Sequence, residues 1–595
     1  MGGTRQTLRF TSLYRIVIAT ASVVVMVAAV GPHGEAAPKP PKTCDLQDGR
    51  YDVGAGWIGD PAPGISVTSA SDEQVVFDLD EGFELVTLCV KTGSELNNYI
   101  SDATLPASGP STITITKAGR GLGIGHLSFD TEAAAGAVTC PEVEAPEVSF
   151  DEPLYIDRQR AGGEPVSVVA QDGSISVSAH AGTTHVYKSP DALPGSRDFV
   201  LGYFNQTLTW RSDDGGRSWQ YIGLAGQREG PHSITSTGFS DPDYAIDQAG
   251  NIYNVEIDLA NVAVFMSPDD GQSYPIANPY AWFGDRPWLT ALEENEVFLY
   301  VNNPRRMLKS SDGGVTWVPY TANVPVSSKS IPDPLNPNDG LIGPVGNLGR
   351  FAIGTEDEAA RTLSWEQHDF GPLGASRQFF GTLGVDNAGN VYQAAAGGYA
   401  GSGDTTPNGE VSFTYFERET EETNAEKIVI PTPPGDALWP WTIAGDDGRA
   451  AVVWYQNLAG DPRNFYIYAA ITHNAHGSTV TCSDGSTREI PPRFTVVNAS
   501  ARPIHFGDIC LQGTTCNANP SFEGGDRRLG DFFTVNFDSE GNLFIASADT
   551  MLQNPLGGAK PVGNPIFIRQ ESGDRMLEQP METRPTRCLW PLPSC

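Results

Sequence analysis

The sequence is poor in the features that mark helical and nucleic-acid-binding proteins. Charged residues make up only 18% of the 595 residues, and 72 Asp and Glu outnumber 38 Lys and Arg. The net charge of −34 repels nucleic acids and anionic lipid surfaces, so neither is expected as a partner. Long runs with helical apolar periodicity are absent after about residue 40. These absences favour an all-β protein.

Glycine and proline are abundant instead. The chain has 65 Gly and 45 Pro together with 39% apolar residues, which is typical of many short strands joined by tight turns. Its length exceeds one ordinary core, although β-propellers reach such sizes as single units. The composition is therefore compatible with one large β domain and a smaller companion.

The first 36 residues are predicted to be a signal peptide. Three arginines precede the apolar run from Ile16 to Val30, and residues 34–36 offer a small-x-small cleavage site. The run is shorter than the roughly 20 residues that a membrane-spanning helix needs. We expect a secreted, extracellular protein with no membrane span after signal cleavage; a retained signal anchor is the alternative.

The eight cysteines lack the paired CxxC spacing of zinc sites. Their even number fits four disulfides in an oxidising compartment. Closeness in the sequence predicts the pairs Cys510–Cys516 and Cys588–Cys595. Within the N-terminal region the predicted pair is Cys89–Cys140.

Composition divides the chain into segments. Alternating apolar and polar residues at 73–79 and 112–116 predict the strands of a small β-sandwich-like domain, and a Pro- and Glu-rich stretch follows it. The predicted order is signal peptide 1–36, spacer 37–43, small β domain 44–140, linker 141–153, main body 154–575 and a disulfide-bearing tail 576–595.

The main body repeats a hairpin pattern, in which two apolar strands flank Asp-x-x-Gly-Asn. Clear copies begin at Asp247, Asp386 and Asp538. Asp and Asn side chains cap such a turn, and Gly adopts its positive φ without steric cost. Looser copies bring the count to six, and a further unit around 341–365 is possible. They lie at 168–177, 288–300 and 443–454.

A second motif, Ser-x-Asp-x-Gly-x-Ser/Thr-aromatic, falls between these hairpins at 212–219, 267–274 and 310–317. It resembles the Asp box of sialidases and related BNR-repeat proteins. The resemblance implies a six- or seven-bladed β-propeller over 154–575, with each box a structural turn between the outer two strands of a blade. Residues 154–156 are predicted to close the ring by pairing near 565–568.

Residues just before each inner strand should converge at one mouth of the central channel. Carboxylates there could carry acid–base chemistry at a glycosidic bond, arginines could clamp an anion, and indoles could stack on sugars. The alternative is structural, with ion pairs locking neighbouring blades and Trp filling the wedge between them. The predicted catalytic residues are Asp285, Arg286, Arg377, Arg528 and Asp531; the predicted substrate-binding residues are Glu164, Trp288, Trp441 and Arg527; Asp241 and Asp243 are candidate Ca²⁺ ligands.

These residues predict a propeller that binds or hydrolyses extracellular glycans, with glycoside hydrolase-like chemistry favoured. True sialidases carry a Phe/Tyr-Arg-Ile-Pro motif ahead of the first Asp box, and this chain has none there, which argues against sialic acid cleavage. The alternative is a non-catalytic propeller scaffold that mediates protein or cell-surface binding. No cofactor other than Ca²⁺ is suggested, and the oligomeric state is left open.

Overall fold

The structure of the chain is a computed structural model that divides into two compact units. Unit 1 comprises Met1–Glu142 with Thr479–Glu489, and unit 2 comprises Val143–Ser478 with Ile490–Cys595. No helix long and apolar enough to span a membrane occurs among the described residues. These residues are 14–19, 23–27, 49–58, 61–71, 74–80, 83–92, 96–101, 111–117, 124–133, 140–182, 184–187, 198–199, 207–224, 240–258, 261–320, 324–376, 378–397, 409–483, 485–513, 516, 525–552 and 562–581.

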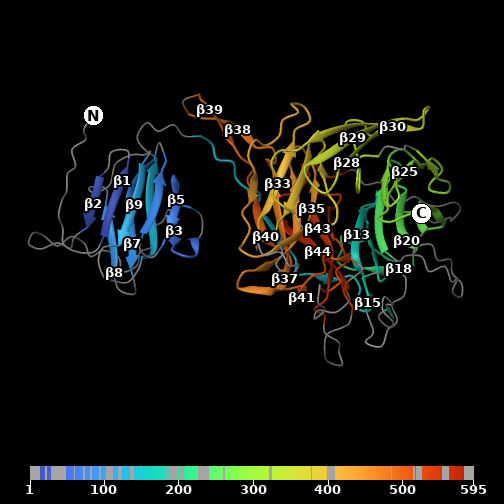
Figure 1. The fold of residues 1–595 in the computed structure, drawn as a ribbon, viewed down its shortest axis with the longest axis horizontal. Helices are drawn as coiled ribbons and strands as arrows, with labels where there is room; N and C mark the ends of the chain where they lie inside the picture. The colour runs from blue at the N-terminus through green and yellow to red at the C-terminus, as the bar shows by residue number, and fades with distance from the viewer. Residues whose placement is uncertain are drawn as a thin grey trace, which may run out of the picture. The chain divides into compact units, whose positions relative to one another are not determined.

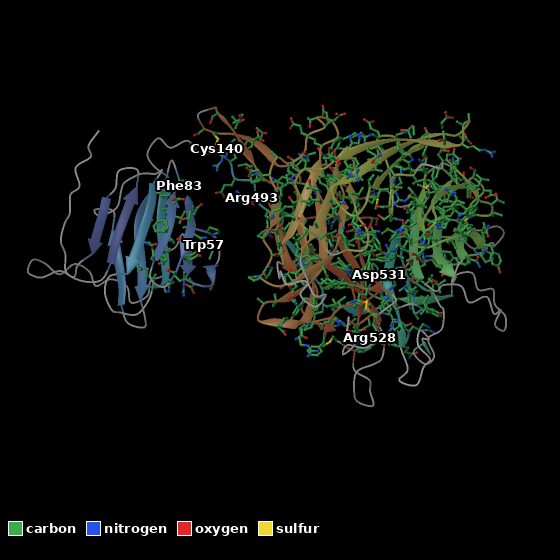
Figure 2. All side chains as sticks on the ribbon, viewed as in Figure 1. Trp57, Phe83, Cys140, Arg493, Arg528 and Asp531 are labelled. Carbon is green, nitrogen blue, oxygen red and sulfur yellow. A yellow bond between two sulfur atoms is a disulfide. The ribbon has the colours of Figure 1, made fainter. Side chains whose placement is uncertain are left out.

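Unit 1 contains two five-stranded antiparallel sheets packed face to face (Figure 1). Phe77 of one sheet meets Phe129 of the other with ring centroids 5.1 Å apart. The ring of Trp57, which is labelled in this unit in Figure 2, lies 5.6 Å from that of Phe129. The strand order in the first sheet is β2 (Val23–Val27), β1 (Tyr14–Ala19), β9 (Ser111–Lys117), β6 (Gln74–Leu79) and β5 (Ile65–Ala70). The strand order in the second sheet is β4 (Gly56–Ile58), β3 (Gly49–Asp52), β10 (Ile124–Ala133), β7 (Phe83–Thr92) and β8 (Leu96–Ser101).

Two of these strands lie inside the predicted signal peptide. β1 pairs with β9 from Tyr14↔Lys117 to Ala19↔Thr112, and β2 pairs with β1. The small domain was predicted to begin at residue 44, so the structure adds two strands to its first sheet. Cleavage of residues 1–36 stays a prediction.

The described residues of unit 2 form seven antiparallel sheets of four or five strands, which we number as blades 1 to 7. Blades 1 to 3 are β13 (Gly163–Val169), β14 (Ile175–His180), β17 (Thr207–Ser212), β18 (Gln220–Leu224); β19 (Ser240–Ile246), β20 (Ile252–Asp258), β21 (Asn261–Ser267), β22 (Ile276–Phe283); and β23 (Trp288–Ala291), β24 (Val297–Asn302), β25 (Arg305–Ser310), β26 (Val318–Pro319).

The remaining blades follow the same order from inner to outer strand. They are β27 (Ile331–Pro332), β28 (Gly340–Pro344), β29 (Arg350–Asp357), β30 (Thr362–Asp369); β31 (Gly384–Val385), β32 (Val391–Ala396), β33 (Val411–Phe416), β34 (Ile428–Ile430); β35 (Ala437–Ala444), β36 (Ala450–Leu458), β37 (Asp461–Thr472), β40 (Thr495–Asn498); and β42 (Thr534–Phe537), β43 (Leu543–Asp549), β44 (Asn564–Gly573), β11 (Val148–Phe150).

Short strands accompany these blades. β12 (Leu154–Tyr155) pairs with β44, and β41 (His505–Phe506) pairs with β37. Two further pairs form two-stranded ribbons: β15 (Val186–Tyr187) with β16 (Asp198–Phe199), and β38 (Ser478–Thr481) with β39 (Thr487–Ile490).

The seven blades close into a β-propeller. The inner strand β13 packs beside both β19 and β42, so the first blade contacts the second and the last. The predicted closure is confirmed, because Leu154 pairs with Phe567 and Tyr155 pairs with Ile566 on β44. Buried apolar side chains fill the wedge between blades 1 and 7, including Trp210, Phe544 and Phe567. The prediction left six or seven blades open, and the structure has seven.

Both repeated motifs form the predicted turns. In the inner hairpin of blade 2, Asp247 Oδ1 accepts hydrogen bonds from the backbone N–H groups of Ala249 and Asn251, at 3.0 and 2.8 Å. In the outer hairpin of blade 3, Asp312 Oδ1 accepts a bond from Thr316 N at 2.8 Å. The turns at 212–219 and 267–274 repeat the second arrangement and join the third and fourth strands of blades 1 and 2. Membership in the sialidase-like family stays a prediction.

One predicted disulfide is confirmed and one is wrong. Cys510 and Cys516 are bonded, whereas Cys140 is bonded to Cys482 rather than to Cys89. Cys89 is itself disulfide-bonded. The pair Cys140–Cys482 spans 342 residues because the ribbon bearing Cys482 interrupts the propeller sequence yet belongs to unit 1. The predicted pair Cys588–Cys595 lies outside the described residues.

Candidate functional site

A repeated backbone feature marks the start of four inner strands. Four residues there have left-handed φ values between 50° and 53°. Each precedes a proline, which restricts its backbone further, and few residues other than glycine adopt this conformation. Such strain costs on the order of 1–3 kcal/mol at each position. The residues and values are Glu164 (52°), Asp241 (50°), Arg286 (51°) and Trp439 (53°).

Three of these residues, Glu164, Asp241 and Trp439, sit in equivalent bulges, whereas Arg286 lies between pairs that keep one register. The pairing register shifts between Gly163 and Val166 in blade 1, between Ser240 and Asp243 in blade 2, and between Leu438 and Trp441 in blade 6. A bulge redirects the side chain that it carries. Because the inner strands run in the same direction around the channel, these side chains gather at one end of it, which we call the mouth.

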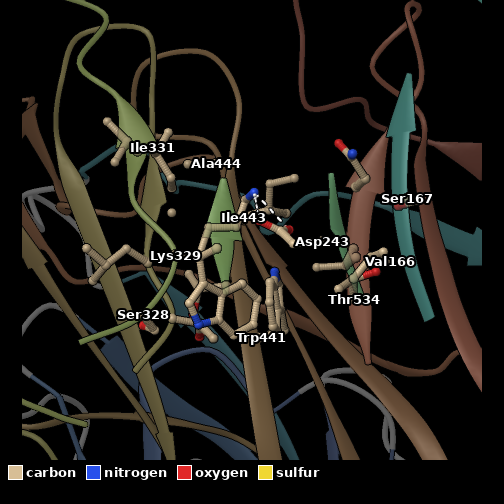
Figure 3. Close-up of a pocket in the computed structure, with 18 of the residues that line it drawn as sticks. Val166, Ser167, Asp243, Ser328, Lys329, Ile331, Trp441, Ile443, Ala444 and Thr534 are labelled. Carbon is tan, nitrogen blue, oxygen red and sulfur yellow. Dashed lines mark hydrogen bonds and ion pairs between the residues drawn. The ribbon is translucent and has the colours of Figure 1, made fainter. Parts of the chain in front are cut away.

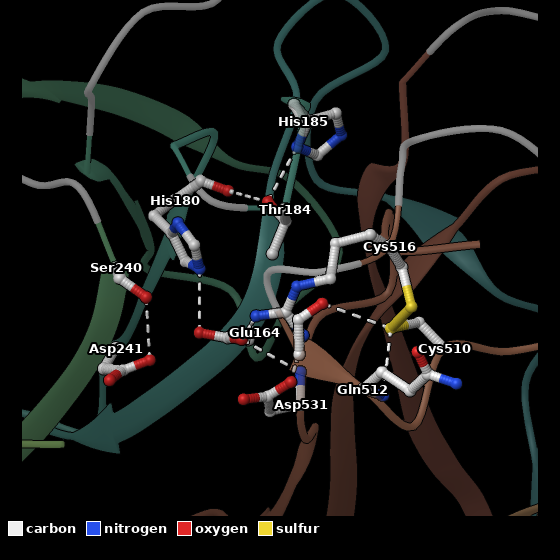
Figure 4. A network of polar contacts seen from close by, with 12 residues as sticks. Glu164, His180, Thr184, His185, Ser240, Asp241, Cys510, Gln512, Cys516 and Asp531 are labelled. Carbon is white, nitrogen blue, oxygen red and sulfur yellow. Dashed lines mark hydrogen bonds and ion pairs between the residues drawn. A yellow bond between two sulfur atoms is a disulfide. The ribbon is translucent and has the colours of Figure 1, made fainter. Parts of the chain in front are cut away.

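Glu164 is the centre of a buried network at the mouth (Figure 4). Its carboxylate accepts hydrogen bonds from His180 Nε2 at 2.8 Å, Arg527 Nη2 at 3.3 Å and the backbone N–H of Asp531 at 2.9 Å. Arg527 also pairs with the Asp531 carboxylate. Gly530 permits this contact, since a Cβ there would lie 2.2 Å from Cγ of Glu164. The network joins blade 1 to the segment that leads into blade 7.

The carboxyl groups of this network have different proton affinities. Burial alone would raise the pKa of Glu164, but its interactions with His180 and Arg527 hold it at about 2. Burial, and then the charges of Glu164, Asp285 and Asp531, raise the pKa of Asp241 well above its usual range. Asp241 therefore binds a proton more tightly than an ordinary aspartate, whereas the neighbouring Glu164 binds one more weakly. Divergent pKa values of adjacent carboxyls are typical of acid–base sites.

Solvent reaches this cluster unevenly. Glu164 is fully buried, whereas Asp241 and Asp531 keep 8% and 9% of their surface exposed, and Asp285 is exposed. Arg286 is half-buried; its guanidinium lies over the rings of Phe379 and Phe380 and donates to the Phe379 carbonyl at 3.3 Å. Asp241, Asp285, Arg286 and Asp531 are thus the members that a ligand can approach.

His180 was not identified from the sequence, and a second buried histidine lies behind it. Burial lowers the pKa of His185 well below its usual value, so its ring is neutral. His185 Nε2 accepts a bond from Gly563 N at 2.9 Å, and its Nδ1 lies 2.7 Å from Thr184 Oγ1. No sequence motif marks either histidine. The X-Pro dipeptide shared by the four positive-φ residues is the sequence signal that could have identified their common position.

Several predicted site residues lie elsewhere. Arg528 forms a buried ion pair with Asp526, to which its Nη2 and Nε atoms donate hydrogen bonds at 2.6 and 2.9 Å. The disulfide-bearing loop supports this pair, because Cys510 N donates to the Asp526 carbonyl at 3.0 Å. Arg377 lies outside the described residues. Since Arg527 and Arg528 are both neutralised by carboxylates, the anticipated arginine clamp for an anion is not formed by these two residues.

The predicted sugar-stacking indoles form an aromatic layer inside the channel. Trp288 contacts Trp441, Phe380 and Phe532 with centroid distances of 6.3, 5.1 and 5.5 Å. Trp288 is 2% exposed. Along each inner strand this layer comes after the mouth residues, so the indoles pack against one another and against phenylalanines below the polar cluster. This position fits the structural alternative for both residues.

Beyond the aromatic layer the channel holds a cavity of about 280 Å³ (Figure 3). Asp243 lines it, and both carboxylate oxygens accept bonds from Lys329 Nζ, at 2.9 and 2.7 Å. Asp243 and Asp241 therefore face different partners, although only Pro242 separates them. No group of three or more metal-binding side chains occurs among the described residues. The geometry gives no support to a shared Ca²⁺ site.

Comparisons with known proteins add only remote likenesses. No protein-family model and no curated protein matches the chain. It is similar to the solved structure of an alpha-L-arabinanase from Penicillium chrysogenum, at 13% identity and a TM-score of 0.30 over 74% of this chain and 100% of that one. It is similar to a GH74 enzyme from Niastella koreensis, at 13% identity and a TM-score of 0.36 over 69% and 60%. It is also similar to YCF48 from Cyanidioschyzon merolae, at 11% identity and a TM-score of 0.35 over 70% and 98%.

Proposed function

We propose that the propeller binds a neutral extracellular glycan at its mouth and hydrolyses a glycosidic bond there. One observation supports the proposal: burial and the neighbouring carboxyl groups, Asp285 among them, raise the pKa of Asp241 well above its usual range, and Asp285 is exposed. Glycosidases use such a pair, with one protonated carboxyl and one carboxylate flanking the scissile bond.

Each carboxyl has a separate role in this proposal. Asp241 donates its proton to the glycosidic oxygen as the C–O bond breaks, and Asp285 takes a proton from the attacking water. Arg286 stands beside Asp285 and donates hydrogen bonds to sugar hydroxyls. Glu164 favours the protonated form of Asp241, because two adjacent negative charges repel each other.

The ligand class follows from charge. Arg527 and Arg528 are occupied by carboxylates, and the whole chain carries −34. An anionic sugar would meet net repulsion at this mouth. The extracellular location rests on the apolar N-terminal run and on the disulfides, which persist in oxidising compartments.

The proposal is tested by turnover of a panel of aryl and alkyl glycosides by the folded protein, with sialosides included. In Asp241→Asn, alkyl glycosides should lose about 10²–10⁴-fold in kcat/KM, because general acid catalysis contributes that much. Aryl glycosides with good leaving groups should lose far less, since they need little protonation. Asp285→Asn should lose activity on both kinds, and Asp369→Asn, on the exposed outer strand β30, is the matched control.

The pH profile provides a second criterion. Because protonated Asp241 is the active form, wild-type activity should fall as the pH rises through its elevated pKa. Equal losses on aryl and alkyl substrates in Asp241→Asn would contradict its role as the acid.

A second candidate function, a non-catalytic binding scaffold, is favoured by a different observation. Glu164, Arg527 and Asp531 satisfy one another within a network that closes the ring. If the folded protein turns over no glycoside but binds glycans saturably in calorimetry, the mouth is a binding site and the hydrolase proposal fails.

A further inference from the structure

Blade 2 exposes aromatic side chains on its outermost strand, β22. Tyr280 and Phe283 are 65% and 53% exposed, and Tyr280 is the most exposed large apolar side chain in the described part of the chain. Trp282 stacks on Phe283, with ring centroids 5.3 Å apart and an interplanar angle of 17°. We call Tyr280, Trp282 and Phe283 the aromatic rim. Apolar surface left in water has an energetic cost, so a cluster of this kind indicates a binding surface.

The rim is built by a wide bulge. Between the pairs Val262↔Trp282 and Val264↔Asn278, β22 holds three residues where β21 holds one. Asn278 fixes the bulge from both ends of its amide: Oδ1 accepts from Tyr280 N at 2.9 Å, and Nδ2 donates to the Val315 carbonyl of blade 3 at 2.7 Å. Bulges redirect side chains, and here the bulge turns Tyr280 out of the sheet.

The rim lies on the same face of the propeller as the mouth. In a four-stranded antiparallel blade the inner strand runs away from the mouth, so the fourth strand returns to that face. β22 ends at Phe283, and Gly284, Asp285 and Arg286 lead directly into the channel. Three residues span at most about 10 Å. Asp285 is held by a two-way backbone pairing with blade 3, to Asn303 O at 3.2 Å and from Asn302 N at 2.9 Å.

We propose that the aromatic rim is a second carbohydrate-binding surface, which holds further sugar rings of a neutral polysaccharide whose end occupies the mouth. The inference rests on the proposed function and extends it from a short glycoside to a polymer. The face of a sugar ring that presents C–H groups is apolar and slightly positive, which suits the negative face of an aromatic ring. The fixed connection through Asp285 gives rim and mouth a constant spacing, so one chain can contact both.

The neutral class again follows from charge, because a polyanion would be repelled by a chain carrying −34. The rim itself contributes no charged side chain. A protein partner for the same aromatic surface is the competing interpretation, and the experiment below separates the two.

The test is the affinity of the intact protein for soluble neutral polysaccharides, with hydroxyethylcellulose, starch and mannan as probes in native gels and calorimetry. Tyr280→Ala with Phe283→Ala should weaken binding roughly tenfold, since each ring contributes a few-fold. Turnover of short glycosides should stay unchanged in that variant. Phe506→Ala, which removes an aromatic ring 41% exposed on β41, is the matched control. Both substituted rim residues are exposed, and circular dichroism checks the fold.

The outcomes separate this inference from the proposed function. If the rim variant binds every polysaccharide as tightly as the wild type, or the wild type binds none of them, the rim inference is wrong while glycoside turnover stands. If the wild type binds a polysaccharide through the rim but turns over no glycoside, the rim is supported and the hydrolase proposal fails. If the rim variant changes only the oligomeric state, the surface is a protein interface and the inference is overturned.

Discussion

Substituting Glu164 by Gln should open the closure between blades 1 and 7. Glu164 is fully buried and accepts hydrogen bonds from His180, Arg527 and the Asp531 backbone. Its pKa falls from 4.5 to about 2, although burial alone would raise it, because its interactions with His180 and Arg527 favour the carboxylate. That difference corresponds to about 3 kcal/mol of stabilisation. The loss from breaking a buried ion pair, about 3–5 kcal/mol, is of the same size.

The pH dependence of this loss has a defined sign. Because folding lowers the pKa of Glu164, its contribution is present above about pH 4.5 and is lost as the pH falls through about 2. Urea denaturation at pH 7 should therefore show Glu164→Gln about 3 kcal/mol less stable than the wild type. Hydrogen exchange should accelerate first in β13 and β42, the strands beside the broken network.

The matched control is Glu571→Gln, an exposed glutamate on β44 of blade 7. It should change the free energy of unfolding by no more than about 0.5 kcal/mol. If Glu164→Gln is as stable as this control at pH 7, the network does not hold the ring closed, and the reasoning from the buried contacts is wrong.

Three further predictions concern stability. Burial lowers the pKa of His505 to about 4, so the unfolded chain takes up a proton between pH 7 and pH 5 while the folded protein does not. The free energy of unfolding of the wild type should therefore fall by about 2 kcal/mol over that range. In urea titrations, His505→Asn should remove this pH dependence. Gly216→Ala should lower the free energy of unfolding by more than about 3 kcal/mol, because its φ is 86° and a Cβ would lie 2.1 Å from the Phe567 ring. In Gly215→Ala the Cβ would meet only the Arg217 guanidinium, at an ordinary contact distance of 3.5 Å, so the loss should be about 1 kcal/mol. Comparable losses in the two variants would contradict the packing argument. Asp243→Asn should lower the free energy of unfolding by about 2 kcal/mol, because the Lys329 ammonium, which lines the channel cavity, loses its counter-charge. An unchanged thermal melting curve would refute this.

Much of the propeller could be predicted from the sequence because its turns are local. An Asp that caps a turn and a Gly with positive φ act within about five residues, as at Asp247 and Asp312, so the pattern is readable wherever it recurs. Blade 4 was only suggested, since its inner hairpin uses a different turn. In that turn the Asp333 carboxylate accepts a hydrogen bond from the backbone N–H of Leu335 at 3.0 Å. The ring closure was also predictable, because strands 154–156 and 565–568 both read as short apolar segments at the two ends of the repeat.

The sequence by itself determined the class of fold, the turn chemistry and the set of polar residues that precede the inner strands. Tertiary structure decided which partner each residue takes. Arg528 forms an ion pair with Asp526, Asp243 forms one with Lys329, and Cys140 forms a disulfide with Cys482. The last two choices join segments 86 and 342 residues apart. Local propensity carries no information about such distances, because tertiary packing brings these side chains into contact: the arrangement of the blades around the channel for Asp243 and Lys329, and the return of the 479–489 segment to unit 1 for the two cysteines.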